Sequence, residues 1–582
     1  MLGQPGNAAS LQPANGVNAY NQAVVLSNFP SRSGRFQRVL SGAFLALFCV
    51  LFAAIGAQGQ ATADNAAATP TADRGRILLV LPFDNRTGQP NLEWVREAAA
   101  ELLSSRFSSV GLAPMSRADR MYALDHLGLP QGFQPSRASS LKLAQTLDAD
   151  QIIVGSYITD GSNIVADARL IDVPHLHMGE PVTARGDLHD LASVFDSLAW
   201  KLTRQLDPRI GVAEETFIAA GKGIHLDAFE QYIRGITEPD QVERLKHLQA
   251  SVKLNPDFSP AWMALGREQY NGQQFDQAAD AFSRVDKNGI DGLEAGYYRG
   301  LALLFSGNYA NAEKAFANVA KILPLAEVVN NQAVAASRQG HDGTVLFVQA
   351  AADDPNSADY HFNLAVSLKR HGQPTPAMNE LAQCLRLRPN DSEAQALQAA
   401  WKQPALKSVS QTATTAGSAN AEPGPDPLER IVRTFDASAF RQAAQMLDEV
   451  DATRLAALPP LEQARKLSAQ AKAFLDRGLL LEAERLYQSA VSADTSCAEA
   501  HAGLAQVRER TGAADAARHE AGVALELKPS ADAYLVLGRL DLDANRLTEA
   551  SNEAAAALKL EPANASAADL MRKVQARTGQ AK

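Results

Sequence analysis

The sequence predicts a multidomain protein with one N-terminal hydrophobic segment, a small α/β domain and an all-α superhelix of helical repeats in two blocks. Three observations lead to this prediction. A continuous run without any charged side chain, residues 39–57, lies near the N-terminus. The stretch after it mixes short apolar runs with amphipathic helical patterns. The remainder repeats its residue types at a spacing of 34, which indicates stacked helix pairs.

Composition excludes several classes of protein. A chain of 582 residues has room for three or four domains of about 150 residues. The net charge of −10 argues against nucleic-acid binding as the main activity. Three cysteines are too few for a disulfide framework or a four-thiolate zinc site. Cys384 and Cys497 fall in separate helical blocks, so we expect free buried thiols.

The N-terminal region indicates export. Residues 1–38 are polar, contain only arginine as a charged residue, and are predicted to be a disordered N-terminal region. Residues 39–57 carry no charge and approach the length of about 20 residues that spans a bilayer. Arginines precede this run and no charge follows it closely, which predicts an N-terminus in the cytoplasm and the rest beyond the inner membrane. Residues 58–73 are an Ala- and Thr-rich linker.

Two interpretations of residues 39–57 remain open. They are the apolar core of a signal peptide that is cleaved near Ala63, after the small-x-small sequence Ala61-Thr62-Ala63, or they are a retained transmembrane anchor. The stretch 1–38 before them is long for the start of a signal peptide, and a start codon set too far upstream would explain this. Both interpretations predict that the rest of the chain lies on the periplasmic side, either secreted or anchored in the inner membrane.

Residues 74–207 are predicted to form the α/β domain. Residues 77–83 are a short continuous apolar run, typical of a buried strand. Apolar residues at steps of three and four predict a helix over 91–108. Two shorter helices follow, one capped by Ser116 and the other over 138–147.

The second half of this domain supplies an antiparallel edge. Residues 151–157 are another buried strand, and Asp160-Gly161 is a hairpin signal. Alternating residues 164–170 form the returning strand, and one more strand covers 178–186. A final amphipathic helix over 188–202 covers the sheet.

This stretch resembles the TolB N-terminal-like domains and the related CsgG and FlgO families of the bacterial envelope. The resemblance covers nearly all of the predicted α/β domain and implies a non-catalytic, protein-binding module. The propeller of TolB is not expected, because no repeats of four short strands follow. The resemblance is carried by LPFDNRTG at 81–88, the helix at 94–107, ALDHLGL at 123–129, DADQIIVGSY at 148–157 and VADARLIDV at 165–173.

Two polar groups in the α/β domain are weak candidates for a site. Residues 84–86, Asp-Asn-Arg, end the first strand, where open α/β sheets often bind ligands, or they form a solvated turn. His175, His177 and His189 lie near one another in sequence. No carboxylate at ligand spacing completes a metal site, so we expect exposed histidines at strand ends.

The helical part carries the most specific pattern. Gly266 and Gly300, Ala278 and Ala312, and Phe282 and Phe316 are three pairs that share the same spacing of 34. Two helices that pack closely need a small residue where they cross, and a large residue fills the gap beside it. Together with Trp262-x-x-Leu265-Gly266, this pattern resembles the tetratricopeptide repeat.

The repeats fall into two blocks. Residues 225–401 are the first block, and residues 402–427 are rich in Ser, Thr, Gly and Pro, which predicts a flexible linker. Residues 428–582 are a second helical block, with clear repeats over 464–564 and a helical start at 428–463 that matches no repeat well. Alanine replaces the aromatic residue in its last two repeats, so the second block is expected to be the less stable one.

The resemblance to tetratricopeptide repeats implies a concave groove that binds other proteins or extended peptides. The first helices of the pairs would line it with aromatic, amide and basic side chains. Each of these residues could instead be a packing residue or a solvated charge. The candidates for a partner-binding groove are Arg267, Tyr270, Asn271, Tyr297, Asn363, Lys369 and Arg370, with Leu304 and Phe305 beside them.

No catalytic motif accompanies the repeats. The sequence has no phosphate-binding loop, no H-E-x-x-H, no G-x-S-x-G and no C-x-x-C. We therefore expect no enzyme activity, no cofactor and no metal. The predicted function is a protein-interaction scaffold or adaptor of the envelope that contacts the inner membrane through residues 39–57 if they stay uncleaved, and no nucleic acid. The alternative is a regulatory subunit whose α/β domain senses a small molecule near residues 84–86.

Overall fold

The computed structural model describes residues 77–130, 136–222, 224–289, 291–402, 427–433 and 450–580. They belong to one compact unit, Arg74–Lys582. The predicted N-terminal region 1–38, the apolar segment 39–57, the cleavage site near Ala63 and the linker 58–73 lie outside the described residues. So does nearly all of the predicted linker 402–427. Within the described part, no helix is long and apolar enough to cross a membrane.

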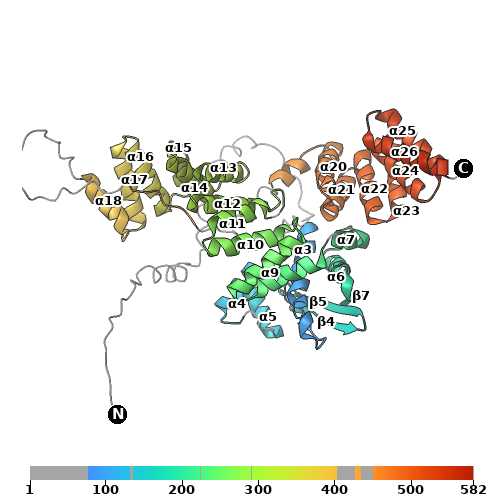
Figure 1. Cartoon of the computed structure of the whole chain (residues 1–582), viewed down its shortest axis with the longest axis horizontal. Helices are drawn as coiled ribbons and strands as arrows, with labels where there is room; N and C mark the ends of the chain where they lie inside the picture. The colour runs from blue at the N-terminus through green and yellow to red at the C-terminus, as the bar shows by residue number, and fades with distance from the viewer. Residues whose placement is uncertain are drawn as a thin grey trace, which may run out of the picture. The chain divides into compact units, whose positions relative to one another are not determined.

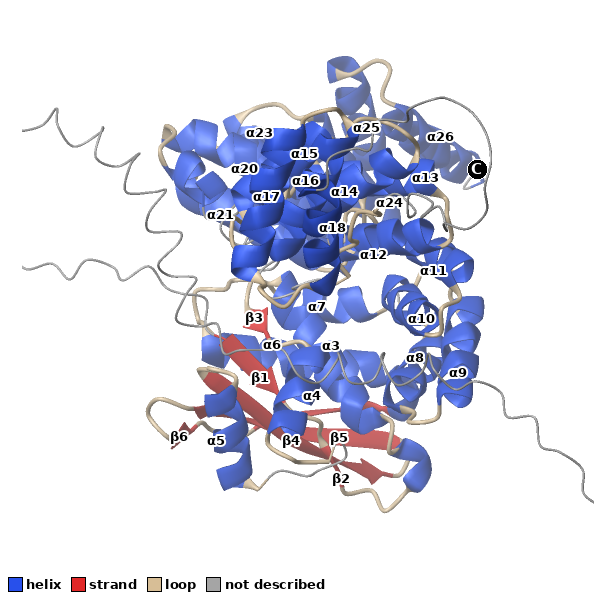
Figure 2. Ribbon diagram, turned by 90° about the vertical axis from the view of Figure 1, so that its left-hand side faces the viewer, coloured by secondary structure: helices blue, strands red, loops and turns tan. Residues whose placement is uncertain are grey.

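The N-terminal part is a mixed seven-stranded sheet in the described residues, with the order β3-β1-β4-β5-β6 (Figure 2). β1 runs parallel to β3 and β4, whereas β5 is antiparallel to β4. β2 pairs with β4, and β7 pairs with β5. The α/β class with an antiparallel edge is therefore confirmed. The strands are β1 (Ile77–Val80), β2 (Asp84–Asn85), β3 (Ala113–Pro114), β4 (Gln151–Asp160), β5 (Asn163–Asp172), β6 (His177–Met178) and β7 (Val182–Asp187).

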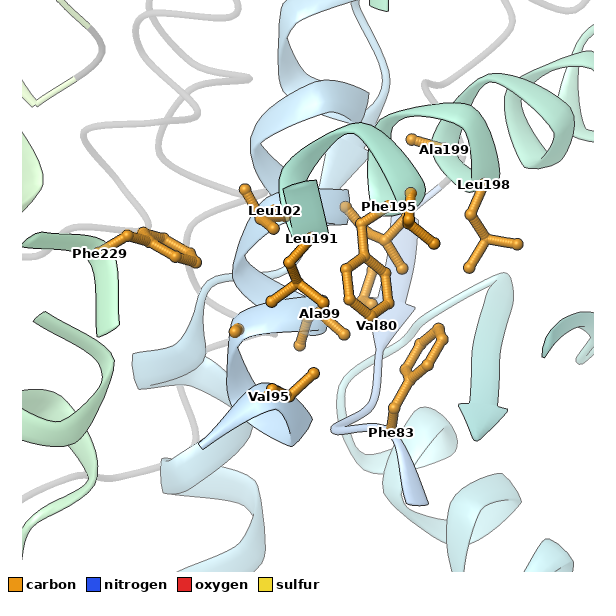
Figure 3. Packing of buried hydrophobic residues seen from close by; sticks show 14 of the residues in the cluster. Val80, Phe83, Val95, Ala99, Leu102, Leu191, Phe195, Leu198, Ala199 and Phe229 are labelled. Atoms are coloured by element: carbon orange, nitrogen blue, oxygen red, sulfur yellow. The ribbon is translucent and has the colours of Figure 1, made fainter. Parts of the chain in front are cut away.

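Apolar residues on both faces of β1 bury this strand. Leu78 and Val80 face one cluster, in which α3 and α6 pack (Figure 3). Leu79 faces the other cluster, which α4 and α5 cover. Phe83 and Phe195 meet edge to face at 5.7 Å in the first cluster. The helices are α3 (Val95–Ser109), α4 (Arg117–His126), α5 (Arg137–Thr146) and α6 (Leu191–Leu206).

Proline interrupts two of the predicted strands in the structure. The strand predicted at 77–83 stops at Val80, because Pro82 has no N–H to donate and the Phe83 N–H bonds to the Arg96 carbonyl of α3 at 3.1 Å. The strand predicted at 178–186 is split into β6 and β7 around Pro181. The predicted hairpin at Asp160-Gly161 and the Ser116 helix cap are both confirmed.

Successive helices pack in pairs through the rest of the chain (Figure 1). Helix α7 (Glu214–Gly221) follows the α/β part. The first block consists of α8 (Leu226–Thr237), α9 (Gln241–Leu254), α10 (Ser259–Asn271), α11 (Phe275–Ser283), α12 (Gly292–Phe305), α13 (Tyr309–Ala320), α14 (Ala326–Arg338), α15 (Thr344–Asp353), α16 (Ala358–Arg370), α17 (Pro374–Leu387) and α18 (Ser392–Lys402).

The second block has the same construction. Cys384 in the first block and Cys497 in the second are free and buried, as predicted. The bounds of its helices are α20 (Pro460–Asp476), α21 (Leu480–Ala493), α22 (Ala498–Thr511), α23 (Ala514–Leu527), α24 (Ala531–Asp543), α25 (Leu547–Leu560) and α26 (Ala565–Gln580).

The small residues of the repeat pattern lie at the helix crossings. A Cβ atom built on Gly300 would come within 2.6 Å of the Phe316 ring, and one built on Gly266 within 2.7 Å of the Phe282 ring. Both phenylalanines are buried. The glycine and the aromatic residue of each repeat therefore fit against each other, which explains why they recur together along the sequence.

Candidate functional site

A short stretch of chain that begins at the last residue of the predicted linker lies across the first block. Residues Pro427–Arg433, the 427–433 segment, have no helical structure. Their polar groups bond to side chains of α14 and α16, and to Tyr297 of α12. The prediction of a helical block from residue 428 is therefore wrong for residues 428–433. The main-chain groups of this segment bond to side chains of α12, α14 and α16 and do not form the hydrogen bonds within the segment that a helix needs.

Two asparagines hold the main chain of this segment. Asn363 of α16 accepts from the Arg430 N–H at 2.6 Å and donates to the Arg430 carbonyl at 2.8 Å. Asn331 of α14 accepts from the Val432 N–H at 3.0 Å and donates to the Val432 carbonyl at 2.8 Å. In an extended chain, alternate residues present their main-chain groups on the same edge. The two amides therefore bind one edge of the segment and do not depend on its side chains.

The asparagines are themselves part of a buried hydrogen-bonded ladder. Asn363 donates to Asn330 at 2.8 Å, Asn330 to Asn331 at 3.2 Å, and Asn331 to the Tyr297 hydroxyl at 3.1 Å. The Tyr297 hydroxyl donates to the Val432 carbonyl at 2.9 Å. All four ladder side chains belong to residues with no exposed surface. Unpaired amides at such depth would be costly, so the ladder fixes each amide in the orientation that meets the main chain.

A basic pocket receives Glu429, which is 3% exposed. Arg370 and Ser337 both donate to its carboxylate. Arg338 donates to the Glu429 carbonyl at 3.0 Å, and its Nε lies 3.7 Å from the carboxylate. Arg370 also donates to the Pro427 carbonyl at 3.2 Å. A carboxylate buried this deeply requires such cationic partners.

An acidic pocket next to it receives Arg430. The Arg430 guanidinium donates to Asp359 at 2.9 Å, to both carboxylate oxygens of Asp391 at 2.7 and 2.8 Å, and to Glu393 at 2.8 Å. Its central carbon lies 3.7 Å from the centre of the Phe362 ring. The planar guanidinium is thus both stacked and bonded around its edge, a geometry that lysine cannot reproduce.

The charges of this pocket perturb one another. Burial alone would lower the pKa of Arg430, but hydrogen bonds to Asp391, Glu393 and Asp359 outweigh it and raise the pKa. The hydrogen bond from Arg430 lowers the pKa of Asp391. Burial acts to raise the pKa of Asp359, but bonds from Arg388 and Arg430 outweigh it and lower that pKa. Arg430, Asp391 and Asp359 are therefore ionised at neutral pH.

An aromatic surface lies at the C-terminal end of the segment. The Arg433 guanidinium carbon is 4.8 Å from the centre of the Phe305 ring. Tyr270 packs against Phe305 with ring centres 6.2 Å apart, and burial raises the pKa of Tyr270 to about 12. This end offers cation–π contacts rather than ion pairs.

The structure brings together part of the groove expected from the sequence. Tyr297, Asn363 and Arg370 bond directly to the 427–433 segment. Tyr270 packs against the Phe305 ring that carries Arg433.

Three expected groove residues lie elsewhere. Arg267 forms an ion pair with Glu294. Asn271 ends α10 and is exposed. The Lys369 ammonium lies 5.5 Å from the centre of the Trp401 ring. None of these contacts involves the 427–433 segment.

The sequence held an unused signal for Asn331. Gly340 and Gly372 both follow the first helix of a pair and adopt positive φ, and the residues nine positions earlier are Asn331 and Asn363. Alignment on these glycines would have matched the two asparagines. The stretch 327–357 departs from the 34-residue spacing, so the repeat pattern alone does not reveal its asparagines. The acidic pocket was also missed, because Asp391 is the last residue of the repeat at 358–391, Glu393 follows that repeat, and neither position belongs to the repeat pattern.

Among the candidates in the α/β part, Asn85 has a structural role. Asn85 accepts from the Thr87 N–H at 3.0 Å and donates to the Gln89 carbonyl at 3.1 Å, so it holds the turn after β2. His175, His177 and His189 are exposed, as predicted. Within the described part of the chain, no three metal-ligating side chains gather into a site.

Comparison with known proteins identifies the repeats. The tetratricopeptide repeat family model matches residues 263–327 and 468–532. No curated protein matches the sequence. The chain therefore carries tetratricopeptide repeats in both helical blocks.

Several solved structures resemble parts of the chain. YrrB, described as a TPR protein with an unusual peptide-binding site, is 14% identical with a TM-score of 0.27, over 35% of this chain and 99% of that chain. MamA from Desulfovibrio magneticus RS-1 is 18% identical with a TM-score of 0.26, over 31% of this chain and 99% of that chain. The LpoB C-terminal domain from Salmonella enterica is 22% identical with a TM-score of 0.18, over 19% of this chain and 83% of that chain.

Proposed function

We propose that this protein is a non-enzymatic scaffold or adaptor that binds extended peptide segments of other proteins in the groove of its first block. One observation carries the proposal: the chain's own 427–433 segment lies there with its main chain held by Asn331 and Asn363. Tetratricopeptide repeats in both blocks support an interaction role. The amide ladder supplies affinity for any extended main chain, and the charged pockets supply selectivity.

The second block lacks the same amides. Gly478, Gly512 and Asn545 are the residues with positive φ after its first helices. The residues nine positions earlier are Ala469, Gly503 and Val536, none of which has a side-chain amide. We therefore assign peptide binding to the first block.

Peptide selection tests the proposal. Random heptapeptides displayed on phage would be selected on a full-length chain with Glu429→Ala and Arg430→Ala, because the intact 427–433 segment uses the same amides and would compete, and then measured singly. We expect bound peptides to lose at least tenfold in affinity when Asn331→Ala and Asn363→Ala are added to this chain, because each alanine removes one donor and one acceptor for the main chain. Asn271→Ala, at an exposed helix end, is the matched control and should leave binding unchanged when added to the same chain. Equal binding with and without the two asparagines would contradict the proposal.

We further propose that the protein works in the bacterial envelope, on the periplasmic side. The apolar segment 39–57, with arginines before it, supports export. The resemblance of residues 74–207 to TolB N-terminal-like, CsgG and FlgO domains supports the same compartment, with the α/β part as a second protein-binding module.

Fusion reporters test the compartment. Alkaline phosphatase joined after residue 73 should be active in cells, since it folds only after export, and deletion of residues 39–57 should abolish that activity. A reporter that stays inactive with residues 39–57 intact would exclude the periplasmic assignment. The electrophoretic mobility of the native chain distinguishes cleavage near Ala63 from a retained anchor.

A further inference from the structure

We infer that the 427–433 segment is a resident ligand that closes the groove, and that partner peptides replace it by presenting an acidic residue followed directly by an arginine. This inference rests on the proposed function and deepens it. It names the state of the groove before a partner binds and the chemistry of the partner.

The first argument is the charge that the segment neutralises. Among the described residues, Glu429 is the carboxylate that pairs with Arg338 and Arg370, so its removal would leave both guanidinium groups without an anion in contact. Within the same described part, removal of Arg430 would leave Asp359 and Asp391 paired only with Arg388, and would leave Glu393 without its cation. An occupant must therefore bring a negative and a positive side chain in that order.

The second argument is the spacing of the contacts along the chain. Arg430 and Val432 meet Asn363 and Asn331, so the acidic residue precedes the first held residue by one position. Ile431, between the two held residues, packs against the apolar cluster of the block. A partner with the order acidic residue, arginine, apolar residue, apolar residue can fill the charged pockets, meet both asparagines and pack on the apolar cluster in one extended conformation.

The third argument is that the segment is tethered. Residues 403–426 join it covalently to α18 of the same block. An intramolecular ligand competes at an effective concentration on the order of mM. A free peptide with the same contacts must overcome this competition, so the closed groove favours partners that bind more tightly or present several copies.

The test uses a fluorescein-labelled peptide with the sequence Pro-Leu-Glu-Arg-Ile-Val-Arg and the full-length chain. Fluorescence anisotropy would compare the wild type with a Glu429→Ala/Arg430→Ala variant, in which the tethered segment has lost both charged contacts. We expect the variant to bind the peptide at least tenfold more tightly than the wild type. A scrambled peptide of the same composition should bind neither chain.

Two further variants keep the result specific. Asp451→Ala/Arg454→Ala removes an exposed acid–base pair outside the groove and should bind as the wild type does. Addition of Asn363→Ala to the opened variant should abolish the gain. Hydrogen exchange of the peptide fragment that contains residues 427–433 should accelerate at least tenfold in the opened variant, because the N–H groups at positions 430 and 432 are then held less often by Asn363 and Asn331.

The outcomes separate this inference from the proposed function. Equal peptide affinity in the wild type and the opened variant overturns the inference, while binding that still depends on Asn363 leaves the proposed function intact. Binding of the scrambled peptide as tightly as the native sequence overturns the acidic–arginine order. Failure of the opened variant to bind any selected peptide through Asn331 and Asn363 overturns both the inference and the proposed function.

Light scattering tests whether the segment comes from the same chain. A dimer that disappears in the opened variant would show that a second copy supplies the segment, which overturns the inference that the segment closes the groove of its own chain.

Discussion

At the scale of single residues, an asparagine in this groove binds the main chain because its amide carries both a donor and an acceptor. Asn331 uses its oxygen for the Val432 N–H and its nitrogen for the Val432 carbonyl. A carboxylate of the same shape would keep the first bond and lose the second. The groove therefore requires amide side chains, because a side chain of the same size without an N–H donor makes only one of the two bonds.

This predicts the effect of Asn331→Asp. The substitution removes the donor to the Val432 carbonyl and places a negative charge beside that oxygen, so the 427–433 segment should exchange its amide hydrogens at least tenfold faster. Mass spectrometry of the fragment that contains this segment measures the change. Asn271→Asp, the same substitution at an exposed position, is the control. Unchanged hydrogen exchange in the Asn331→Asp variant would show that the Asn331 amide does not hold the segment.

Glu101 illustrates a different effect of burial. Burial raises its pKa to about 7, the charge of Glu97 adds to this, and Arg120 opposes it. The Tyr232 hydroxyl donates to it at 3.4 Å. The pKa of Glu101 in the folded protein exceeds its pKa in the unfolded chain, so folding favours the protonated carboxyl. The stability that this protonation contributes is fully present below pH 4.5 and is lost as the pH rises through 7.

We therefore expect Glu101→Gln to stabilise the protein at pH 8 by about 1–3 kcal/mol and to have little effect at pH 4.5. Urea unfolding of the wild type and the variant at both pH values provides the measurement. A stability difference that does not change between the two pH values would show that the carboxyl does not titrate as stated.

The sequence predicted individual groove residues only where the repeat pattern was clear. Tyr297, Asn363 and Arg370 lie on first helices, and the structure places them against the segment. Lys369 is on the same helix as Asn363, but its long side chain turns to Trp401. The direction of a flexible basic side chain depends on neighbours that are distant in sequence, which periodicity does not reveal.

At the scale of elements, the helices were predicted more closely than the strands. Repeat spacing located the helix pairs, because glycine, alanine and phenylalanine each occupy a fixed place at the crossing. Strands 77–83 and 178–186 were predicted as continuous, but each contains a proline that interrupts its hydrogen bonding. One proline is enough to divide a short strand, whereas the pattern of a helix pair is spread over many positions.

The crossing of α12 and α13 gives a prediction. Gly300→Ala should destabilise the first block by about 1–3 kcal/mol, because the new methyl group would lie 2.6 Å from the Phe316 ring. Urea unfolding measures this. Phe316→Leu should cost less in the Gly300→Ala background than in the wild type, which a double-mutant cycle would show as coupling.

Gly522 provides the matched control for this substitution. It lies inside α23, and a Cβ atom built on it meets nothing within 4 Å. Gly522→Ala should stabilise the protein by about 0.5–1 kcal/mol, since alanine is the better helix former. If Gly300→Ala and Gly522→Ala change the free energy of unfolding alike, helix propensity rather than the close contact with Phe316 determines the effect at Gly300.

At the scale of the whole molecule, the contact of the 427–433 segment with the first block is the feature least accessible from the sequence. Asn331 and Val432 are 101 residues apart. The apolar residues of the segment resemble the start of a helix, and its position after a Ser- and Gly-rich stretch suggested a new block. Only the assembled groove shows that its main chain has partners elsewhere.

The second block is attached to the rest mainly through its first repeat. Leu481 of α21 joins the apolar cluster of the α/β part. Glu484 accepts from the Ala213 N–H at 3.2 Å and pairs with Arg508 at 2.6 Å. The helices after α22 contact chiefly one another. In a stacked array, each repeat is supported only by its neighbours, so this end has support on one side alone.

This arrangement predicts that α24–α26 open before α12–α14. Their core contains Ala550, Ala554 and Ala557, where the first block has Phe282 and Phe316, so less apolar surface is buried at each crossing. Native-state hydrogen exchange at increasing urea should therefore show α24–α26 exchanging through a partial opening at lower urea than α12–α14. Leu570→Ala, in the core of α26, should promote that opening without accelerating exchange in α12–α14. Exchange of all these helices in one transition would mean that the attachment at Leu481 couples the whole chain into a single cooperative unit.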